Sequence, residues 1–233
     1  MVRWKQIMSD LKTHFNQASE EFDTLVEKTI PKYNEMIEAL VNSIPEKENL
    51  RILDLGCGTG NISLQVLERF PDAKITCLDI SDKMLDVAKE KLAGYENIEF
   101  VLGDFTIVDI IDDYDAIISS LALHHIKDEN DKRQMYQCIY DSLKQDGVFY
   151  NADVIEANSK YNAKLNERIA DKYMAENQVT TEDMKDHKNK REHNDHPITI
   201  TDHLRLLEDV GFKEIDIIWK YYSNAVYGGT HKE

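Results

Sequence analysis

The segment Asp54-Leu55-Gly56-Cys57-Gly58-Thr59-Gly60 constrains the fold of this chain more than any other part of the sequence. It follows the short apolar run 51–55 and precedes the amphipathic stretch 62–70. Glycine has no Cβ, so a glycine-rich turn bends tightly and lets a ligand approach its backbone closely. The helix that follows presents free N–H groups and the positive end of its dipole. A strand, a glycine turn and a helix in this order predict an α/β fold with a ligand site at the turn.

Strand and helix patterns alternate over residues 50–155. Apolar runs of strand length recur, and apolar residues at helical spacing fill the gaps between them. Strands joined through helices run in the same direction, so this alternation predicts βαβ units and a parallel sheet. After a further helix, two strands with a short link predict an antiparallel pair at the end of the sheet. The strands are expected at residues 51–55, 74–79, 98–102, 115–120, 148–154, 215–219 and 221–226.

The spacing of apolar residues and the density of charged residues divide the chain into four regions. Residues 1–49 carry apolar residues at three- and four-residue steps and are expected to form an N-terminal helical cap. Residues 50–155 form the α/β core, and the polar, charged stretch 156–197 is expected to be a helical insertion that serves as a lid. Residues 198–233 complete the core with a helix, capped by Thr201, and the last strands.

Composition and charge limit the classes of protein that fit. The apolar fraction of 42% is typical of a chain with a packed core. The formal net charge of -16 repels phosphate backbones, which disfavours a large nucleic-acid substrate. No run of about 18 uncharged apolar residues and no secretion signal is found, so we expect no membrane span and a cytoplasmic protein. The three cysteines match neither a disulfide framework nor a zinc cluster.

Two acidic residues stand where later strands end. Asp79 ends the second strand, a position from which a carboxylate accepts both hydroxyls of a ribose. Asp104 follows the third strand, where a carboxylate accepts the exocyclic amine of adenine and Phe105 flanks the ring; a helix-capping Asp104 beside a core Phe105 is the alternative. Because the ends of parallel strands share one edge, the turn and both acids predict a nucleoside site. The spacing Gly-x-Gly-x-Gly differs from the pyrophosphate-binding Gly-x-Gly-x-x-Gly, which argues against NAD.

From Asp54 to Gly147 the chain resembles the class I S-adenosylmethionine (SAM)-dependent methyltransferases. The resemblance rests on the glycine turn, the two acids, the segment 119–126 after the fourth strand and the turn 143–147 before the fifth. It implies a Rossmann-like, doubly wound, seven-stranded, mostly parallel sheet with an antiparallel last strand. It also implies methyl transfer from SAM to a small-molecule acceptor, with S-adenosylhomocysteine as product. The cofactor-binding residues that it implies are Asp54, Gly56, Cys57, Gly58, Gly60, Asp79, Ile80, Met84, Asp104, Phe105 and Ser120.

A finer resemblance, to the carboxy-SAM synthases and related small methyltransferases, covers the flank Thr29-Ile30-Pro31-Lys32-Tyr33. A tyrosine at this position contacts the cofactor in those synthases, which makes Tyr33 a further cofactor-binding candidate. The synthases also carry an arginine in the insertion, where this chain has Lys188, and lysine is no bidentate substitute for arginine. Three functions therefore stay open: a methyltransferase, a synthase of the carboxy-SAM type in a tRNA wobble modification pathway, and a SAM-binding protein without turnover.

His124 and His125 follow the fourth strand, at the mouth of the expected cleft. An imidazole titrates near neutrality, so one of them is the candidate catalytic base or the residue that orients the acceptor. One packed and one solvated histidine is the alternative. Asp153, at the end of the fifth strand, is a candidate for the acceptor pocket. The segment 183–203 is rich in histidine and carboxylates, but its spacing matches no standard site, so no metal is expected. A homodimer stays open.

Overall fold

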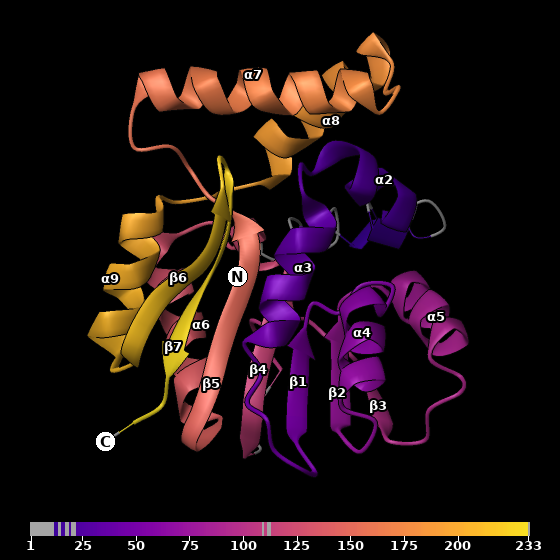
Figure 1. The fold of residues 1–233 in the computed structure, drawn as a ribbon, viewed down its shortest axis with the longest axis vertical. Coiled ribbons are helices and arrows are strands. Elements are labelled where there is room, and N and C mark those ends of the chain that lie inside the picture. The colour runs from indigo at the N-terminus through magenta and orange to yellow at the C-terminus, as the bar shows by residue number, and fades with distance from the viewer. Residues whose placement is uncertain are drawn as a thin grey trace.

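Strands and helices alternate along the chain in the computed structural model (Figure 1), which describes residues 12–13, 15–16, 19, 22–108, 110 and 113–232. The expected cap at residues 1–49 therefore lies partly outside the described residues. The strands are β1 (Arg51–Leu55), β2 (Lys74–Asp79), β3 (Ile98–Leu102), β4 (Tyr114–Ser120), β5 (Leu143–Val154), β6 (Lys213–Tyr221) and β7 (Asn224–Thr230). The helices are α2 (Phe22–Thr29), α3 (Tyr33–Asn42), α4 (Asn61–Arg69), α5 (Asp82–Lys91), α6 (Glu129–Asp141), α7 (Lys160–Glu176), α8 (Thr181–Asn194) and α9 (Ile200–Val210), with a 3-10 turn η1 (Leu123–His125).

The strands form one seven-stranded sheet in the order β3-β2-β1-β4-β5-β7-β6. The pairs from β3 across to β5 are parallel, whereas β7 runs antiparallel to β5 and β6. This arrangement confirms the expected doubly wound, mostly parallel sheet with an antiparallel last strand. From β1 the chain adds β2 and β3 on one side, and it then crosses to the other side of β1 to add β4 and β5. The direction in which strands are added therefore reverses between β1 and β4, and open α/β sheets bind ligands at such a point.

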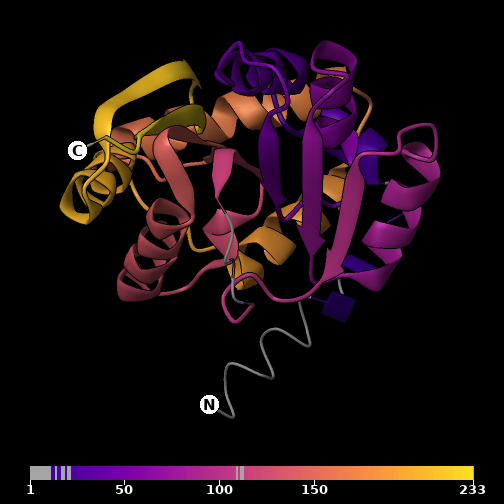
Figure 2. The ribbon, with the colours of Figure 1, turned by 90° about the horizontal axis from the view of Figure 1, so that it is seen from below.

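Helices cover both faces of the sheet, as Figures 1 and 2 show from two directions. Alternate residues of β1 point to opposite faces: Ile52 packs with α3, α4 and α5, whereas Leu53 packs with α6 and α9. Strands buried on both faces explain the continuous apolar runs of the sequence. Among the residues that the structure describes, no helix is both long enough and apolar enough to cross a bilayer.

The insertion after β5, which we call the lid (residues 156–197), folds into α7 and α8. The parallel strands run upward in Figure 1, and α2, α7 and α8 lie above their carboxyl ends. The hydroxyl of Tyr173 in α7 donates to the carbonyl oxygen of Glu27 in α2 at 2.8 Å, so the lid rests on α2. At the base of the lid, Glu156 pairs with Thr199 in an isolated parallel bridge. The lid therefore leaves the sheet and returns to it at one place.

Two boundaries near the C-terminus differ from those expected. Thr199 caps α9 instead of Thr201, because the Thr199 hydroxyl accepts from the N–H of Asp202. The last two strands begin and end at other residues than expected, because β6 continues to Tyr221 and the link is Tyr222–Ser223. A turn at these residues places the glycine pair 228–229 inside β7, where sequence alone indicates the end of a strand.

Gly228 in β7 is expected to tolerate no side chain. A Cβ at this position would lie 1.9 Å from the carbonyl oxygen of Phe149 in β5, which is backbone and cannot turn away. We expect Gly228→Ala to lower the free energy of unfolding, measured with urea, by about 1 to 3 kcal/mol. Gly94→Ala is the matched control, because a Cβ at Gly94 meets nothing within 4 Å. Equal stability of the two variants would contradict the register of β5 and β7.

Candidate functional site

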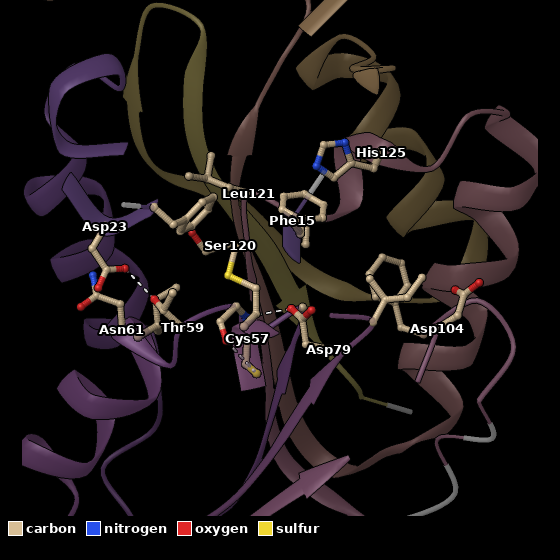
Figure 3. Close-up of a pocket in the computed structure, with 18 of the residues that line it drawn as sticks. Phe15, Asp23, Cys57, Thr59, Asn61, Asp79, Asp104, Ser120, Leu121 and His125 are labelled. Atoms are coloured by element: carbon tan, nitrogen blue, oxygen red, sulfur yellow. Dashed lines mark hydrogen bonds between the residues drawn. The ribbon is translucent and has the colours of Figure 1, made fainter. Parts of the chain in front are cut away.

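A cavity lies at the carboxyl ends of β1, β2 and β4 (Figure 3). The space between its lining residues is about 880 Å³, and part of that space is open to solvent. Asp54, Gly60 and His124 lie outside its wall. The wall brings together the other residues proposed from the sequence, namely Tyr33, Gly56, Cys57, Gly58, Asp79, Ile80, Met84, Asp104, Phe105, Ser120 and His125.

The glycine turn forms one side of this cavity. Gly56 and Gly58 have φ angles of 75° and 53°, in the left-handed region that favours glycine. The N–H groups of Gly56 and Cys57 both donate to the carbonyl oxygen of Leu78, at 2.8 and 3.0 Å, which fastens the turn to β2. A Cβ at Gly56 would lie 2.5 Å from the Cβ of Ala122 across the wall. The missing side chain therefore lets the end of β1 approach the segment after β4.

Two of the proposed residues support the turn from outside the cavity. Gly60 is the N-cap of α4. A Cβ there would lie 3.1 Å from the Cβ of Ala88, so the missing side chain lets α5 pack closely against the turn. Asp54 is fully buried and accepts a hydrogen bond from the Ser63 hydroxyl at 2.6 Å. Its Oδ1 has no hydrogen-bond partner among the described residues. Burial raises the pKa of the Asp54 carboxyl to about 7.

Asp79 joins the turn to the beginning of α5. Its Oδ2 accepts from the N–H of Gly58 and its Oδ1 from the N–H of Ser81, each at 2.8 Å. Ser81 in turn caps α5, because its hydroxyl accepts from the N–H of Met84. Burial raises the pKa of Asp79, against the effect of the two N–H donors. Each carboxylate oxygen keeps a lone pair, so Asp79 can accept from two further donors in the cavity.

Asp104 carries a carboxylate oxygen that lacks a donor. Its Oδ1 accepts from the N–H and the hydroxyl of Thr106, at 2.9 and 2.6 Å. Its Oδ2 is buried without a hydrogen-bond partner among the described residues. Because an unsatisfied buried oxygen costs about 1–3 kcal/mol, an N–H donor from a ligand would be favoured here. Phe105 and Ile80 line the same cavity and offer apolar surface to a flat ring.

The remaining wall comes partly from residues that sequence reasoning missed. Asp23 of α2 accepts from the Thr59 hydroxyl at 2.5 Å and from the Lys91 ammonium at 2.6 Å. The amide of Asn61 donates to the hydroxyl of Tyr33 at 3.4 Å, and burial raises the pKa of Tyr33 to about 12. Thr59 and Asn61 were detectable as neighbours of the proposed glycines. Leu121, Ala122 and Ile126 belong to the segment 119–126 that carries the resemblance, and Ile62 begins the amphipathic stretch after the turn. Asp23, Phe15 and Phe22 had no such signal.

His125 lies in the wall beside Phe15, with ring centroids 5.4 Å apart (Figure 3). Its Nδ1 donates to the carbonyl oxygen of Asn194 at 3.1 Å, which leaves the lone pair on Nε2. Burial, together with the positive charge of the neighbouring His124, lowers the pKa of His125 to about 3. His125 is therefore a neutral hydrogen-bond acceptor, and so low a pKa makes it a poor proton acceptor at neutral pH.

His124 is buried behind His125 and takes part in ion pairs. Its Nδ1 donates to Oδ1 of Asp153 at 2.5 Å, and its Nε2 lies 3.5 Å from Oδ1 of Asp195. Burial alone would lower the pKa of His124, but the two carboxylates outweigh it and raise the pKa to about 9. His124 is therefore cationic at neutral pH, and Asp153 serves it instead of lining the cavity.

The histidine-rich segment disperses in the structure. His187 and His193 stand on α8, whereas His203 is buried on α9 and its Nδ1 accepts from the Tyr136 hydroxyl at 2.7 Å. Within the described ranges, the group whose ligand atoms lie close enough to hold a metal ion is instead His124, His125 and Asp195.

Lys188, the residue that the resemblance places near the arginine of the carboxy-SAM synthases, forms ion pairs within the lid. Its ammonium donates to Glu167 and to Asp171 of α7, each at 2.9 Å. It is absent from the residues that line the cavity.

Known proteins resemble this chain in sequence. A family profile described as a methyltransferase domain matches residues 52–147. The carboxy-S-adenosyl-L-methionine synthase of Nautilia profundicola is 25% identical over 219 residues, 91% of this chain and 91% of that protein. The malonyl-[acyl-carrier protein] O-methyltransferase of Acetivibrio thermocellus is 31% identical over 138 residues, 59% of this chain and 47% of that protein. The chain matches about half the length of this second relative.

Solved structures resemble it in fold. Human N-acetylserotonin methyltransferase, solved in complex with SAM, superposes with a TM-score of 0.66 at 18% sequence identity. The superposition covers 95% of this chain and 57% of the human protein. At this identity the likeness concerns the fold, and it agrees with the sheet order described above.

The buried carboxyl of Asp54 leads to a prediction about pH. Its pKa of about 7 in the folded protein lies above the usual 3.8, so between these values the folded chain holds a proton that the unfolded chain releases. The stability that depends on Asp54 therefore falls as the pH rises through this window. We expect Asp54→Asn, which has no charge to bury, to gain stability relative to the wild type between about pH 4 and 7, by about 4 kcal/mol at most.

Urea unfolding of both proteins across this pH range measures the effect. Asp72→Asn, at an exposed position, is the control and should keep a constant difference from the wild type. A constant difference for Asp54→Asn as well would show that the Asp54 carboxyl ionises normally in the folded protein.

Proposed function

Because this chain belongs to the class I SAM-dependent methyltransferase family, we propose that it transfers the methyl group of SAM to a small acceptor without strong negative charge, bound beside His125. When bound, SAM supplies a methyl group already activated by the sulfonium. The protein then has to orient the acceptor and exclude water. The observation that carries this proposal is that two carboxylates, Asp79 and Asp104, stand beside the glycine turn in the wall of one cavity.

The residues of the cavity fit the adenosine part of SAM. Asp79 has two lone pairs left for the hydroxyls of a ribose, after accepting from Gly58 and Ser81. The Oδ2 of Asp104, which lacks a donor, would accept a hydrogen bond from the exocyclic amine of adenine. The open space over Gly58, where a Cβ would meet nothing nearer than 4.0 Å, admits a ligand to the backbone of the turn. These groups together support SAM as the bound nucleoside.

The charge of the wall supports both a cationic cofactor and the class of acceptor. Asp23, Asp79 and Asp104 contribute carboxylates, and the described wall residues include no lysine or arginine. A sulfonium is favoured beside carboxylates, whereas an anionic acceptor would meet these carboxylates and, among the described wall residues, no lysine or arginine. We therefore infer an acceptor that is neutral or cationic.

His125 is the residue that we assign to the acceptor. Its Nδ1 proton is held by the carbonyl oxygen of Asn194, so Nε2 is left to accept a hydrogen bond from an acceptor hydroxyl or amine. The low pKa of about 3 favours orientation by hydrogen bonding over removal of the proton. His124, which was proposed beside it, acts as a positioning residue through its ion pairs and not as a catalytic residue.

Carboxy-SAM synthesis is the second candidate function. It is supported by the match to the Nautilia profundicola synthase, which extends over most of both chains, and by the position of Tyr33 in the cavity wall. A carboxylate on the cofactor requires a cation close to it, and Lys188 is instead engaged by Glu167 and Asp171. Mass spectrometry of the nucleoside that copurifies with the protein separates the two functions, since carboxy-SAM is heavier than SAM by one carboxyl group.

We expect Asp104→Asn to weaken the binding of S-adenosylhomocysteine about 10- to 100-fold, because a charge-assisted hydrogen bond contributes about 1.5–3 kcal/mol. Asp79→Asn is expected to weaken it by at least as much, because both ribose hydroxyls lose a charged acceptor. Calorimetric titration measures both affinities. Asp72→Asn, exposed and remote from the cavity, should bind as the wild type does. Unchanged affinity of both cavity variants would refute the adenosine site.

The role of His125 is tested with His125→Asn. The asparagine amide can replace Nδ1 as donor to the Asn194 carbonyl, but nothing replaces Nε2. We expect S-adenosylhomocysteine formation, measured with panels of hydroxyl, amine and thiol acceptors, to fall at least 10-fold. The affinity for S-adenosylhomocysteine should change no more than about 3-fold, which is less than the loss of one hydrogen bond to the cofactor would cause. His193→Asn, at an exposed position of the lid, is the control. An equal loss of affinity and turnover would assign His125 to cofactor packing.

A further inference from the structure

Two histidines and one carboxylate converge where the lid meets the loop after β4. Oδ1 of Asp195 lies 3.5 Å from Nε2 of His124 and 3.4 Å from Nδ1 of His125. Both separations are longer than the distance of about 2.7–2.9 Å in a charge-assisted hydrogen bond. The two ring centroids lie 4.0 Å apart, with the rings tilted by 48°. The three ligand atoms all lie within 4.8 Å of one another.

The two separations from Asp195, 3.5 and 3.4 Å, match the geometry of one kind of metal ion. In a tetrahedral zinc site the bonds of about 2.1 Å place neighbouring ligand atoms about 3.4 Å apart. An octahedral magnesium site with bonds of about 2.1 Å would place them about 3.0 Å apart and would use oxygen ligands. Two imidazole nitrogens and one carboxylate oxygen are the donor set of a zinc-type ion.

We propose that His124, His125 and Asp195 bind one divalent transition-metal ion of the zinc type. The site is new with respect to the sequence, since Asp195 alone comes from the histidine-rich segment. The site shares His125 with the proposed acceptor site, whereas its other two ligands, His124 and Asp195, lie outside the cavity wall.

The surroundings of the ligands are those that metal sites require. Metal-binding histidines usually donate their second ring N–H to a carboxylate, which fixes the ring. Nδ1 of His124 donates to Oδ1 of Asp153 at 2.5 Å, so Nε2 is the nitrogen that faces Asp195. Asp153 is itself held by the backbone N–H of His124 at 3.0 Å. The other oxygen of Asp195 accepts from Nε of Arg191 at 3.3 Å.

The charges close to the site balance a divalent ion. Asp153 and Asp195 each carry one negative charge within reach of His124. Without a metal, protonated His124 meets both carboxylates alone. With a metal, the proton on Nε2 is replaced and the two carboxylates face two positive charges, which reduces the cost of burying the ion.

The ion would connect two parts of the fold. His124 and His125 belong to η1, next to β4, whereas Asp195 is the C-cap residue of α8 in the lid. The N–H of His196 already donates to the carbonyl oxygen of His124 at 2.8 Å. Coordination through Nδ1 of His125 would replace its bond to the Asn194 carbonyl and leave the ring proton on Nε2. In the metal-bound protein Nε2 would then donate a hydrogen bond to the acceptor, whereas in the metal-free protein it accepts one. The metal would therefore fasten the lid to the core.

The test measures metal binding and needs no acceptor. The full-length protein is stripped with a chelator, dialysed against Zn²⁺ or Co²⁺, and assayed by calorimetry and elemental analysis. We expect one ion per chain and, with Co²⁺, the visible absorption of tetrahedral coordination. Asp195→Asn should bind at least about 10-fold more weakly. Asp186→Asn, an exposed acid of the same helix paired with Lys190, is the matched control and should bind as the wild type does.

Asp153→Asn is the second variant, expected to weaken binding about 10- to 100-fold through the orientation of His124. Circular dichroism checks that each variant is folded. Binding of no ion by the wild type would overturn the proposal. Equal binding by Asp195→Asn and Asp186→Asn would overturn it too, because it would show an adventitious ion only. The affinity of the stripped protein for S-adenosylhomocysteine, measured in parallel, tests the cofactor site separately.

Discussion

The hydrogen bonds of the Asp79 carboxylate hold together two of the loops that form the cavity. Asp79 stands at the end of β2 and accepts from the turn after β1, through Gly58, and from the start of α5, through Ser81. The same turn is fastened to β2 a second time, through the carbonyl oxygen of Leu78. Two loops that follow different strands are thereby fixed relative to each other before any ligand binds. β1 is the central strand of the parallel part of the sheet, and β2 lies next to it, so this pair of loops stands in the middle of the cavity's side of the sheet.

Sequence reasoning placed a residue correctly where its position depends on its place along a strand. Asp79 and Asp104 were placed in one cavity because the ends of parallel strands share an edge, and the structure puts both in its wall. It failed where tertiary contacts decide. Asp23 reaches the cavity only because α2 packs across the edge of the sheet, and no local pattern predicts that. The N-cap of α9 is Thr199 and not the expected Thr201, because the N–H of Asp202, three residues later, donates to the Thr199 hydroxyl.

The histidine pair shows how far position in the chain can mislead. Two identical side chains, adjacent in sequence, were interchangeable candidates before the structure. Asp153 and Asp195 make His124 a buried cation, whereas His125 is buried beside that cation and stays neutral. The carboxylates responsible come from β5 and from the lid, far from the pair in sequence. A role assigned to either histidine therefore depends on groups that only the fold brings near.

The parallel bridge between Glu156 and Thr199 has an evolutionary consequence. It places the first residue of the lid next to the segment that follows the lid, so the strand order of the sheet does not depend on the length or sequence of the chain between them. The entropy of closing such a loop grows slowly, by about 0.6 kcal/mol for each doubling of its length. Descendants of one ancestral gene can therefore exchange this segment for a longer, shorter or differently charged one. Acceptor preference can diverge in this way while the machinery for the nucleoside is inherited intact.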